Sequence, residues 1–302
     1  MWRAILAILV LGALIGACGG DDDSQAPATD GFDAERAFRD LEAQVAFGPR
    51  PSGSPGNREV VELIASRLEA AGAREVGVQR PWRNVVATVP GSERGVVVVG
   101  AHHDTKNDVG PGFVGANDGA SGVAVVLELA RVLAEGAPLD GPSIQFALFD
   151  AEEARGDREF ALDGLRGSRQ YLEYAVAGGK QGSAPVGEIG AMVLFDLVGD
   201  CDLGIPREAN SDAGLYSQFE AAAEEATGAA APFGGEASGV LDDHIPFAEA
   251  GIPAVDLIDF TFGPGSSPGA YWHTVEDTLD KVCPESLDAV GEAALIALPR
   301  LP

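Results

Sequence analysis

The chain has 302 residues, of which 46% are hydrophobic, and a formal net charge of -27 from 47 acidic and 20 basic residues. This length allows one large domain with a sizeable core, or two small ones. The strong negative charge argues against binding to nucleic acid, or to anionic lipid through a basic surface.

The N-terminal residues resemble an export signal. Arg3 precedes an apolar run, residues 4–17, that is too short to span a bilayer. The run ends in Ile15-Gly16-Ala17-Cys18, which resembles the bacterial lipoprotein signal, in which the Cys is lipidated and becomes the mature N-terminus. We therefore expect removal of residues 1–17, a lipid on Cys18, and an exported protein anchored to the outer face of a bacterial cell membrane. An uncleaved anchor or an ordinary secretory signal is the alternative.

The segment after Cys18 differs in composition from the rest of the chain. Residues 18–31 contain an Asp run and Pro, Ala and Thr, with little to bury, so we expect a disordered acidic tether. Residues 32–302 would then form the folded domain. The remaining cysteines, Cys201 and Cys283, permit one disulfide in an exported protein, and two free buried thiols are the alternative.

Apolar periodicity predicts alternating strands and helices along the domain. Strands are expected at 76–78, 85–89, 96–99, 144–149, 191–195 and 253–258, and helices over 32–47, 60–72, 122–133, 217–228 and 284–298, with another that begins at Arg166. Residues 155–167 and 199–211 are expected to be long irregular loops, which are usually functional. This alternation predicts a single α/β domain with a mixed, mostly parallel sheet flanked by helices.

Four of the apolar strands end at His or carboxylate residues, or lead to them through a loop. Open α/β sheets bind their ligands beyond the carboxyl ends of the strands. Side chains alternate along a strand, so Asp104 lies on the same side as His102 and is able to orient its imidazole, whereas His103 faces the other way and is expected to pack or to be exposed. The residues at these strand ends are His102, Asp104, Glu152, Glu153, Asp196 and His273.

These residues, together with Asp118, offer nitrogen and oxygen ligands of the kind that suits zinc. In a site with two metal ions, a bridging carboxylate and two further ligands for each ion leave room for a water, whose pKa the ions lower. Of the adjacent Glu152 and Glu153, one is then free to act as a base while the other binds metal. The alternative is a set of polar strand ends without metal, but unpaired carboxylates gathered there would repel one another.

Several sequence blocks, in one order, resemble the M28 zinc metallopeptidases over about residues 32–298. The blocks are FGPRPSGSPG at 47–56, HHDTK at 102–106, GANDGASG at 115–122, FDAEE at 149–153, FD at 195–196 and WHT at 272–274. The resemblance implies the zinc-exopeptidase fold, with a mixed sheet of about eight strands. It also implies a cis peptide bond after Asp118.

The resemblance also implies a role for each ligand. Asp118 would bridge two zinc ions, with His102 and Asp196 completing one site. Glu153 and His273 would complete the other. Glu152 would then be the general base, and Asp104 would orient His102.

Two further blocks, 241–247 and 271–273, resemble most the glutaminyl cyclase branch of this family, whose enzymes bind one zinc and cyclise N-terminal glutamine. In that case Asp118, Glu153 and His273 would hold the zinc and Glu152 would shuttle a proton. Asp196 and Asp242 would form a carboxylate network. The chain departs from this branch at Asp256, where the branch has a His, and in residues 155–160, which lack the Trp that the branch has after the Glu pair.

Three functions therefore remain open. The first is a zinc aminopeptidase with two ions, which hydrolyses N-terminal residues of peptides with Glu152 as base. The second is a glutaminyl-peptide cyclotransferase with one ion, and the third a non-catalytic, lipid-anchored binding protein. The partners expected are peptide N-termini, and the membrane through lipidated Cys18. The residues expected at the substrate pocket are Asp242, His244, Asp256 and Trp272, although Trp272 would equally suit core packing.

Overall fold

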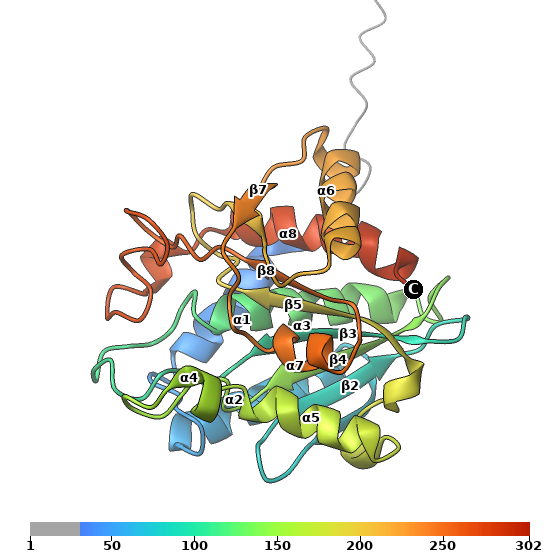
Figure 1. Ribbon diagram of the computed structural model, residues 1–302, viewed down its shortest axis with the longest axis horizontal. Helices are drawn as coiled ribbons and strands as arrows, with labels where there is room; N and C mark the ends of the chain where they lie inside the picture. The colour runs from blue at the N-terminus through green and yellow to red at the C-terminus, as the bar shows by residue number, and fades with distance from the viewer. Residues whose placement is uncertain (1–30) are drawn as a thin grey trace, which may run out of the picture.

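The computed structural model describes residues 31–302 (Figure 1). The predictions of a signal peptide, of a tether up to residue 30 and of lipid on Cys18 lie outside the described residues. Within residues 31–302, no helix combines the length and the apolar character needed to cross a bilayer.

A six-stranded sheet forms the centre of the domain, in the order β1-β2-β4-β3-β5-β8. Strands β3, β4, β5 and β8 run parallel to one another, while β2 pairs antiparallel with both β4 and β1. The register pairs His102 with Phe149 and Asp196 with Ile258, so the carboxyl ends of the parallel strands meet at one edge. The strands are β1 (Arg74–Val78), β2 (Val85–Val89), β3 (Val96–His102), β4 (Ser143–Phe149), β5 (Ile189–Asp196) and β8 (Ala254–Ile258).

Helices cover both faces of this sheet (Figure 1). The alternation of β3 shows the two faces: Val97 and Val99 belong to the core under α1, α2, α3, α6 and α8, and Val98 belongs to a smaller core under α5 and α7. The helices are α1 (Ala34–Val45), α2 (Pro55–Ala70), α3 (Ala120–Glu135), α4 (Phe160–Asp163), α5 (Arg166–Val176), α6 (Ala213–Thr227), α7 (His244–Glu249) and α8 (Pro284–Ala297), with short 3-10 turns at Lys180–Gly182, Val186–Glu188, Leu279–Lys281 and Leu298–Arg300. The expected mixed α/β architecture is thereby confirmed.

Side-chain caps explain where several of these helices begin. Asp33, Ser54 and Asp212 each accept a hydrogen bond from a backbone N–H in the first turn of α1, α2 and α6 respectively. Asp212 starts α6 at Ala213, four residues before the helix expected at 217–228. Proline occupies the first turn of α2 and α8, where its missing N–H has no partner to lose.

Within residues 31–302, eight strands form two sheets instead of the single sheet that the resemblance implied. Strand β6 (Ile205–Glu208) pairs with β7 (Phe233–Ala237) in a separate two-stranded sheet, and β6 lies inside the segment that we expected to be an irregular loop. The other expected loop, 155–167, contains the single turn of α4. Strand β6 is four residues long and contains a Pro, and β7 contains two Gly. Neither of them has the alternating apolar pattern of a strand.

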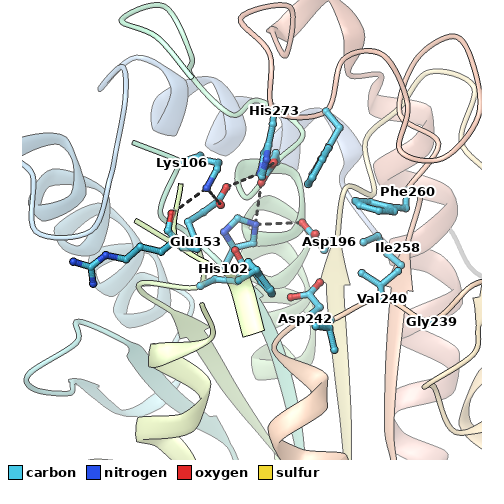
Figure 2. Close-up of a pocket in the computed structure, with 17 residues that line it drawn as sticks. His102, Lys106, Glu153, Asp196, Gly239, Val240, Asp242, Ile258, Phe260 and His273 are labelled. Carbon is cyan, nitrogen blue, oxygen red and sulfur yellow. Dashed lines mark hydrogen bonds and ion pairs between the residues drawn. The ribbon is translucent and has the colours of Figure 1, made fainter. Parts of the chain in front are cut away.

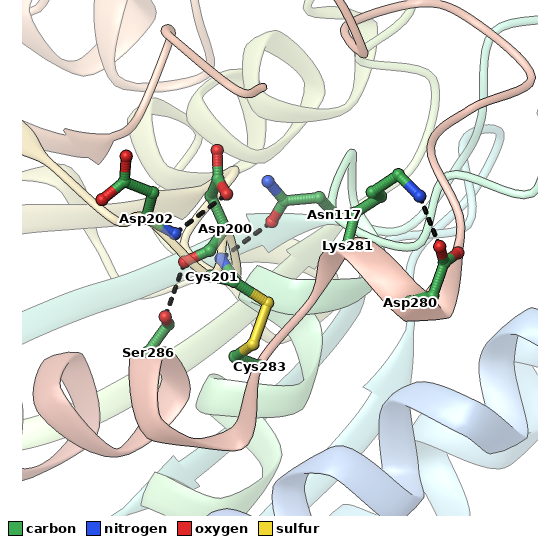
Figure 3. The surroundings of a disulfide bond; sticks show 9 residues. Asn117, Asp200, Cys201, Asp202, Asp280, Lys281, Cys283 and Ser286 are labelled. Carbon is green, nitrogen blue, oxygen red and sulfur yellow. Dashed lines mark hydrogen bonds and ion pairs between the residues drawn. A yellow bond between two sulfur atoms is a disulfide. The ribbon is translucent and has the colours of Figure 1, made fainter. Parts of the chain in front are cut away.

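Two predictions from the sequence concern single bonds, a disulfide and a cis peptide bond. Cys201 and Cys283 form a disulfide, which joins the segment after β5 to the segment before α8 (Figure 3). The cis peptide bond expected after Asp118 is not found, because every cis bond within residues 31–302 precedes a proline. The chain turns there instead at Gly119, whose φ of +87° suits glycine.

Candidate metal centre

Six side chains from five segments of the chain converge beyond the carboxyl edge of the sheet. Figure 2 labels four of them, His102, Glu153, Asp196 and His273. Two groups of three have ligand atoms within 4.8 Å of one another: His102, Asp118 and Asp196 in the first, and Asp118, Glu153 and His273 in the second. Asp118 belongs to both groups. The sixth, Glu152, belongs to neither group and lines the adjacent cavity.

The distances show how Asp118 faces both histidines. His102 Nε2 lies 3.2 Å from Asp118 Oδ1 and 3.3 Å from Asp196 Oδ1. His273 Nε2 lies 3.4 Å from Asp118 Oδ2 and 3.0 Å from Glu153 Oε1. Each oxygen of Asp118 therefore serves one group, as a bridging carboxylate requires.

Unusual backbone conformations accompany the ligands. Ala151 precedes the Glu pair with φ +60°, Leu197 follows Asp196 with φ +49°, and His273 itself has φ +52°. Non-glycine residues rarely adopt this left-handed region outside sites where the surrounding structure enforces it. Gly119 allows the His102 ring to approach the start of α3, because a Cβ atom there would lie 2.9 Å from that ring.

Asp104 holds the Glu pair as well as facing His102. Its Oδ1 atom lies 3.7 Å from His102 Nδ1, which is longer than a hydrogen bond. The same carboxylate accepts hydrogen bonds from the backbone N–H groups of Glu152, at 3.0 Å, and Glu153, at 3.4 Å. Asp104 thus connects the end of β3 to the end of β4.

Unsatisfied polar atoms show that this arrangement suits a cation. His102 Nδ1, Asp118 Oδ2 and Glu153 Oε2 are buried and have no hydrogen-bond partner within the described residues. Such atoms are expensive to bury unpaired, and a divalent cation would satisfy the two carboxylate oxygens. The donor set of imidazoles and carboxylates is the one that zinc takes in open, catalytic sites.

The electrostatics distinguish Glu152 from the ligands. Burial, reinforced by the nearby Glu153 and Asp242 carboxylates, holds the pKa of Glu152 well above its usual range. In contrast, the neighbouring histidines and Arg50 outweigh burial at Asp118 and lower its pKa. A carboxyl group with a raised pKa is suited to accept and return protons.

The cavity beside these residues has a volume of about 360 Å³. Its apolar wall includes Trp272, which stacks on the His273 ring at 3.9 Å and meets Phe260 edge to face at 5.1 Å. Asp242 also lines the cavity, as expected. The residues Phe160, Val240, Leu241, Ile258, Phe260 and Trp272 form the apolar wall.

His244 and Asp256, which the sequence predicts at the pocket, lie behind its wall instead. Both are fully buried, and neither lines the cavity. The His244 Nε2 and Nδ1 atoms lie 3.3 Å from Glu208 and 3.6 Å from Asp256, respectively. Asp256 is in the middle of β8, so its side chain points into the packing under the sheet instead of beyond the strand end.

His103 and two basic side chains, Lys106 and Arg158, lie around the site. His103 is buried, with its ring nitrogens 3.4 Å from Asn57 Nδ2 and 3.3 Å from the Arg83 carbonyl, so it packs as predicted. Sequence reasoning missed Lys106 and Arg158, which also line the cavity. Lys106 Nζ donates to the Ala154 carbonyl at 3.0 Å and lies 3.7 Å from Glu153 Oε2. The position of Lys106 directly after the His-His-Asp-Thr run was the available signal.

Similar proteins fall into two functional groups. A structure titled glutaminyl cyclase from an Acidobacteriales bacterium is 32% identical with a TM-score of 0.77, over 95% of this chain and 98% of that one. The glutaminyl-peptide cyclotransferase of Boiga irregularis is 28% identical over 282 residues, covering 80% of this chain and 75% of that protein. A Zn-dependent exopeptidase from Parabacteroides distasonis is 26% identical with a TM-score of 0.71, over 91% of this chain and 98% of that one.

The family model described as Peptidase family M28 matches residues 84–298, which include every candidate ligand and Glu152. That span is more than two thirds of the chain and contains most of the central sheet. This chain therefore belongs to peptidase family M28.

Proposed function

We propose that this chain is a zinc-dependent exopeptidase that hydrolyses the first peptide bond of its substrates, that is, an aminopeptidase. The observation that carries the proposal is the pair of three-residue ligand groups that share Asp118. One zinc ion would use His102 and Asp196, and the other Glu153 and His273. Two adjacent sites with a common carboxylate are typical of metal-assisted hydrolysis.

Zinc bound at these residues would polarise the scissile carbonyl and lower the pKa of a water molecule. Glu152 borders the cavity without belonging to either ligand group, so its carboxylate is free to accept a proton from water. Its raised pKa then favours keeping that proton until the leaving amine takes it. Proton transfer by a side chain in such a position contributes about 10²- to 10⁴-fold to a rate.

The cavity supports a substrate that presents its N-terminal residue. Its volume of about 360 Å³ is at the small end of ligand sites, which suits a terminal residue better than a chain passing through. The apolar wall around Trp272 and Phe260 would receive an apolar side chain. The net charge of -27 would attract the terminal ammonium group to the protein.

A second candidate is a glutaminyl-peptide cyclotransferase, and specific observations favour it. The two relatives named as cyclases match 95% and 80% of this chain. The cavity contains Asp242 beside Glu152, and burial holds the pKa of Asp242 well above its usual range. Phe160, from the segment where that branch has a Trp, supplies an aromatic ring to the wall. In that reaction the α-amine would attack the side-chain amide carbon of glutamine and give a proton to Glu152. The bond from that carbon to the amide nitrogen would break, and ammonia would leave with the proton that Glu152 returns.

Paired assays on the purified, zinc-loaded protein separate the two reactions. Release of a chromophore from aminoacyl anilides, together with two zinc ions per chain, is the result expected for the exopeptidase. Loss of ammonia from peptides with N-terminal glutamine, together with one zinc ion, would overturn it in favour of the cyclase. Absence of activity in both assays would instead support the alternative of a non-catalytic binding protein.

A further inference from the structure

A buried carboxylate outside both ligand groups holds the shared ligand by its backbone. Asp277 accepts hydrogen bonds from the backbone N–H groups of Asn117, at 2.7 Å, and Asp118, at 3.1 Å. It is fully buried and follows His273 by four residues in the chain. Asp277 therefore ties the segment that carries His273 to the backbone of the carboxylate that both ligand groups share.

Asn117 extends this connection to the third ligand-bearing segment. Its side-chain oxygen accepts from the Gly199 N–H at 2.8 Å, and its side-chain nitrogen donates to the Leu197 carbonyl at 3.4 Å. Leu197 and Gly199 follow Asp196 by one and three residues. Figure 3 shows the Asn117 side chain near this segment and the disulfide between Cys201 and Cys283.

We propose that Asn117 and Asp277 are positioning residues that fix Asp118 between Asp196 and His273, so that both metal groups form together. This inference rests on the metal-binding part of the proposed function, and it holds for either reaction. Neither residue binds metal in this proposal, since both carboxylate oxygens of Asp277 are used by backbone N–H groups. Residues that orient metal ligands typically change metal affinity about 10- to 100-fold when they are replaced.

The Asp277→Asn variant tests the role of the carboxylate. An amide offers one acceptor oxygen instead of two, so one of the two backbone N–H groups would face an NH₂ group and lose its partner. The matched control is Asp259→Asn. Asp259 is also fully buried and accepts from two backbone N–H groups, those of Gly204 and Thr261, both at 2.9 Å, but it holds no ligand.

Zinc affinity of the metal-free full chain is measured by competition with a chromogenic chelator, alongside the melting temperature with and without zinc. We expect Asp277→Asn to weaken zinc binding about 10- to 100-fold and to reduce the zinc-induced rise in melting temperature. We expect Asp259→Asn to lower the metal-free melting temperature while zinc affinity stays at the wild-type value. Equal zinc affinity in wild type and Asp277→Asn would overturn the proposal.

Asn117→Ala provides a second test if Asp277→Asn does not fold. It removes the side-chain hydrogen bonds to Leu197 and Gly199 but keeps the backbone N–H that donates to Asp277. We again expect about a tenfold or greater loss of zinc affinity, and wild-type affinity would overturn the role of Asn117. A wild-type chain that binds no zinc at all would instead refute the proposed function, together with this inference.

Discussion

The Oδ1 atom of Asp104 accepts a hydrogen bond from the backbone N–H of Glu152, at 3.0 Å. Asp104 therefore fixes the main chain of Glu152 while leaving the Glu152 side chain free to border the cavity. One consequence is that the Glu152 side chain can be altered without disturbing the bond that holds its backbone. The proposed base is thereby separable from the proposed ligands by experiment.

We expect Glu152→Gln to lower kcat about 10²- to 10⁴-fold, because an amide accepts no proton from water or amine. Zinc content should stay at the wild-type value, since Glu152 belongs to neither ligand group. Turnover of the preferred substrate measures kcat, and elemental analysis of the purified variant measures its zinc content. Glu153→Gln serves as the control that should lose metal. If Glu152→Gln lost metal instead, the roles of base and ligand would have to be exchanged.

The predicted site residues that the structure brings together include those that follow a strong local pattern. His102 and Asp196 follow runs of buried apolar residues, and the parallel register then brings the ends of those runs together. Short-range periodicity predicts such strands well, and strand ends at one edge of a sheet are where open α/β folds bind ligands. The family resemblance added the pairing of each ligand with its metal group.

The parts that the sequence did not predict depend on contacts between distant segments. Asp277 and its partner Asp118 are 159 residues apart, and nothing near Asp277 indicates that two backbone N–H groups face it. His244 lies behind the cavity because β6 brings Glu208 to one side of it and β8 brings Asp256 to the other. Strand β6 has no alternating pattern, so the position of Glu208 could not be inferred from local sequence.

The metal-free protein should become less stable as the pH rises from 5 to 8. Burial raises the pKa of Asp243 to about 7 and that of Asp277 to about 7, above the values near 3.9 expected in the unfolded chain. Between those pH values the folded state binds more protons than the unfolded state, so its stability falls with increasing pH. His103 has the opposite effect on the change of stability with pH, because burial lowers its pKa. The buried carboxyl groups with a raised pKa outnumber it.

Melting temperatures of the metal-free protein at a series of pH values test this expectation. Zinc should reverse part of the loss at pH 8, because its binding becomes tighter as the ligands deprotonate. Asp243→Asn is the matched control, since an amide does not titrate, and its melting temperature should change less with pH. A melting temperature of the metal-free wild type that rises between pH 5 and pH 8 would contradict the assignment of raised pKa values.

Removing the disulfide should destabilise the fold by about 4 kcal/mol, because the bond closes a long loop in the unfolded chain. Cys201 and Cys283 are 82 residues apart in sequence. The double variant Cys201→Ser, Cys283→Ser is compared with wild type in urea unfolding, both with zinc bound. Backbone hydrogen bonds between the same segments, such as Cys283 N–H to the Gly199 carbonyl at 3.0 Å, should keep the ligands in place and the zinc content unchanged. Loss of zinc in the double variant would show that these bonds alone do not hold the segments.

We further propose that lipid on Cys18 anchors the chain to the outer face of a bacterial membrane. The support is the apolar run that ends in Ile15-Gly16-Ala17-Cys18. The attached lipid would hold the chain to the membrane, because burial of acyl chains provides about 0.8 kcal/mol per CH₂ group. We expect Cys18→Ser to move the protein from the membrane fraction to the soluble fraction when both are expressed in a bacterial host. Ser24→Ala, in the same segment, is the control that should stay with the membrane. Fractionation followed by detergent phase partitioning measures the distribution, and a Cys18→Ser variant that still sediments with membranes would point to an uncleaved apolar anchor.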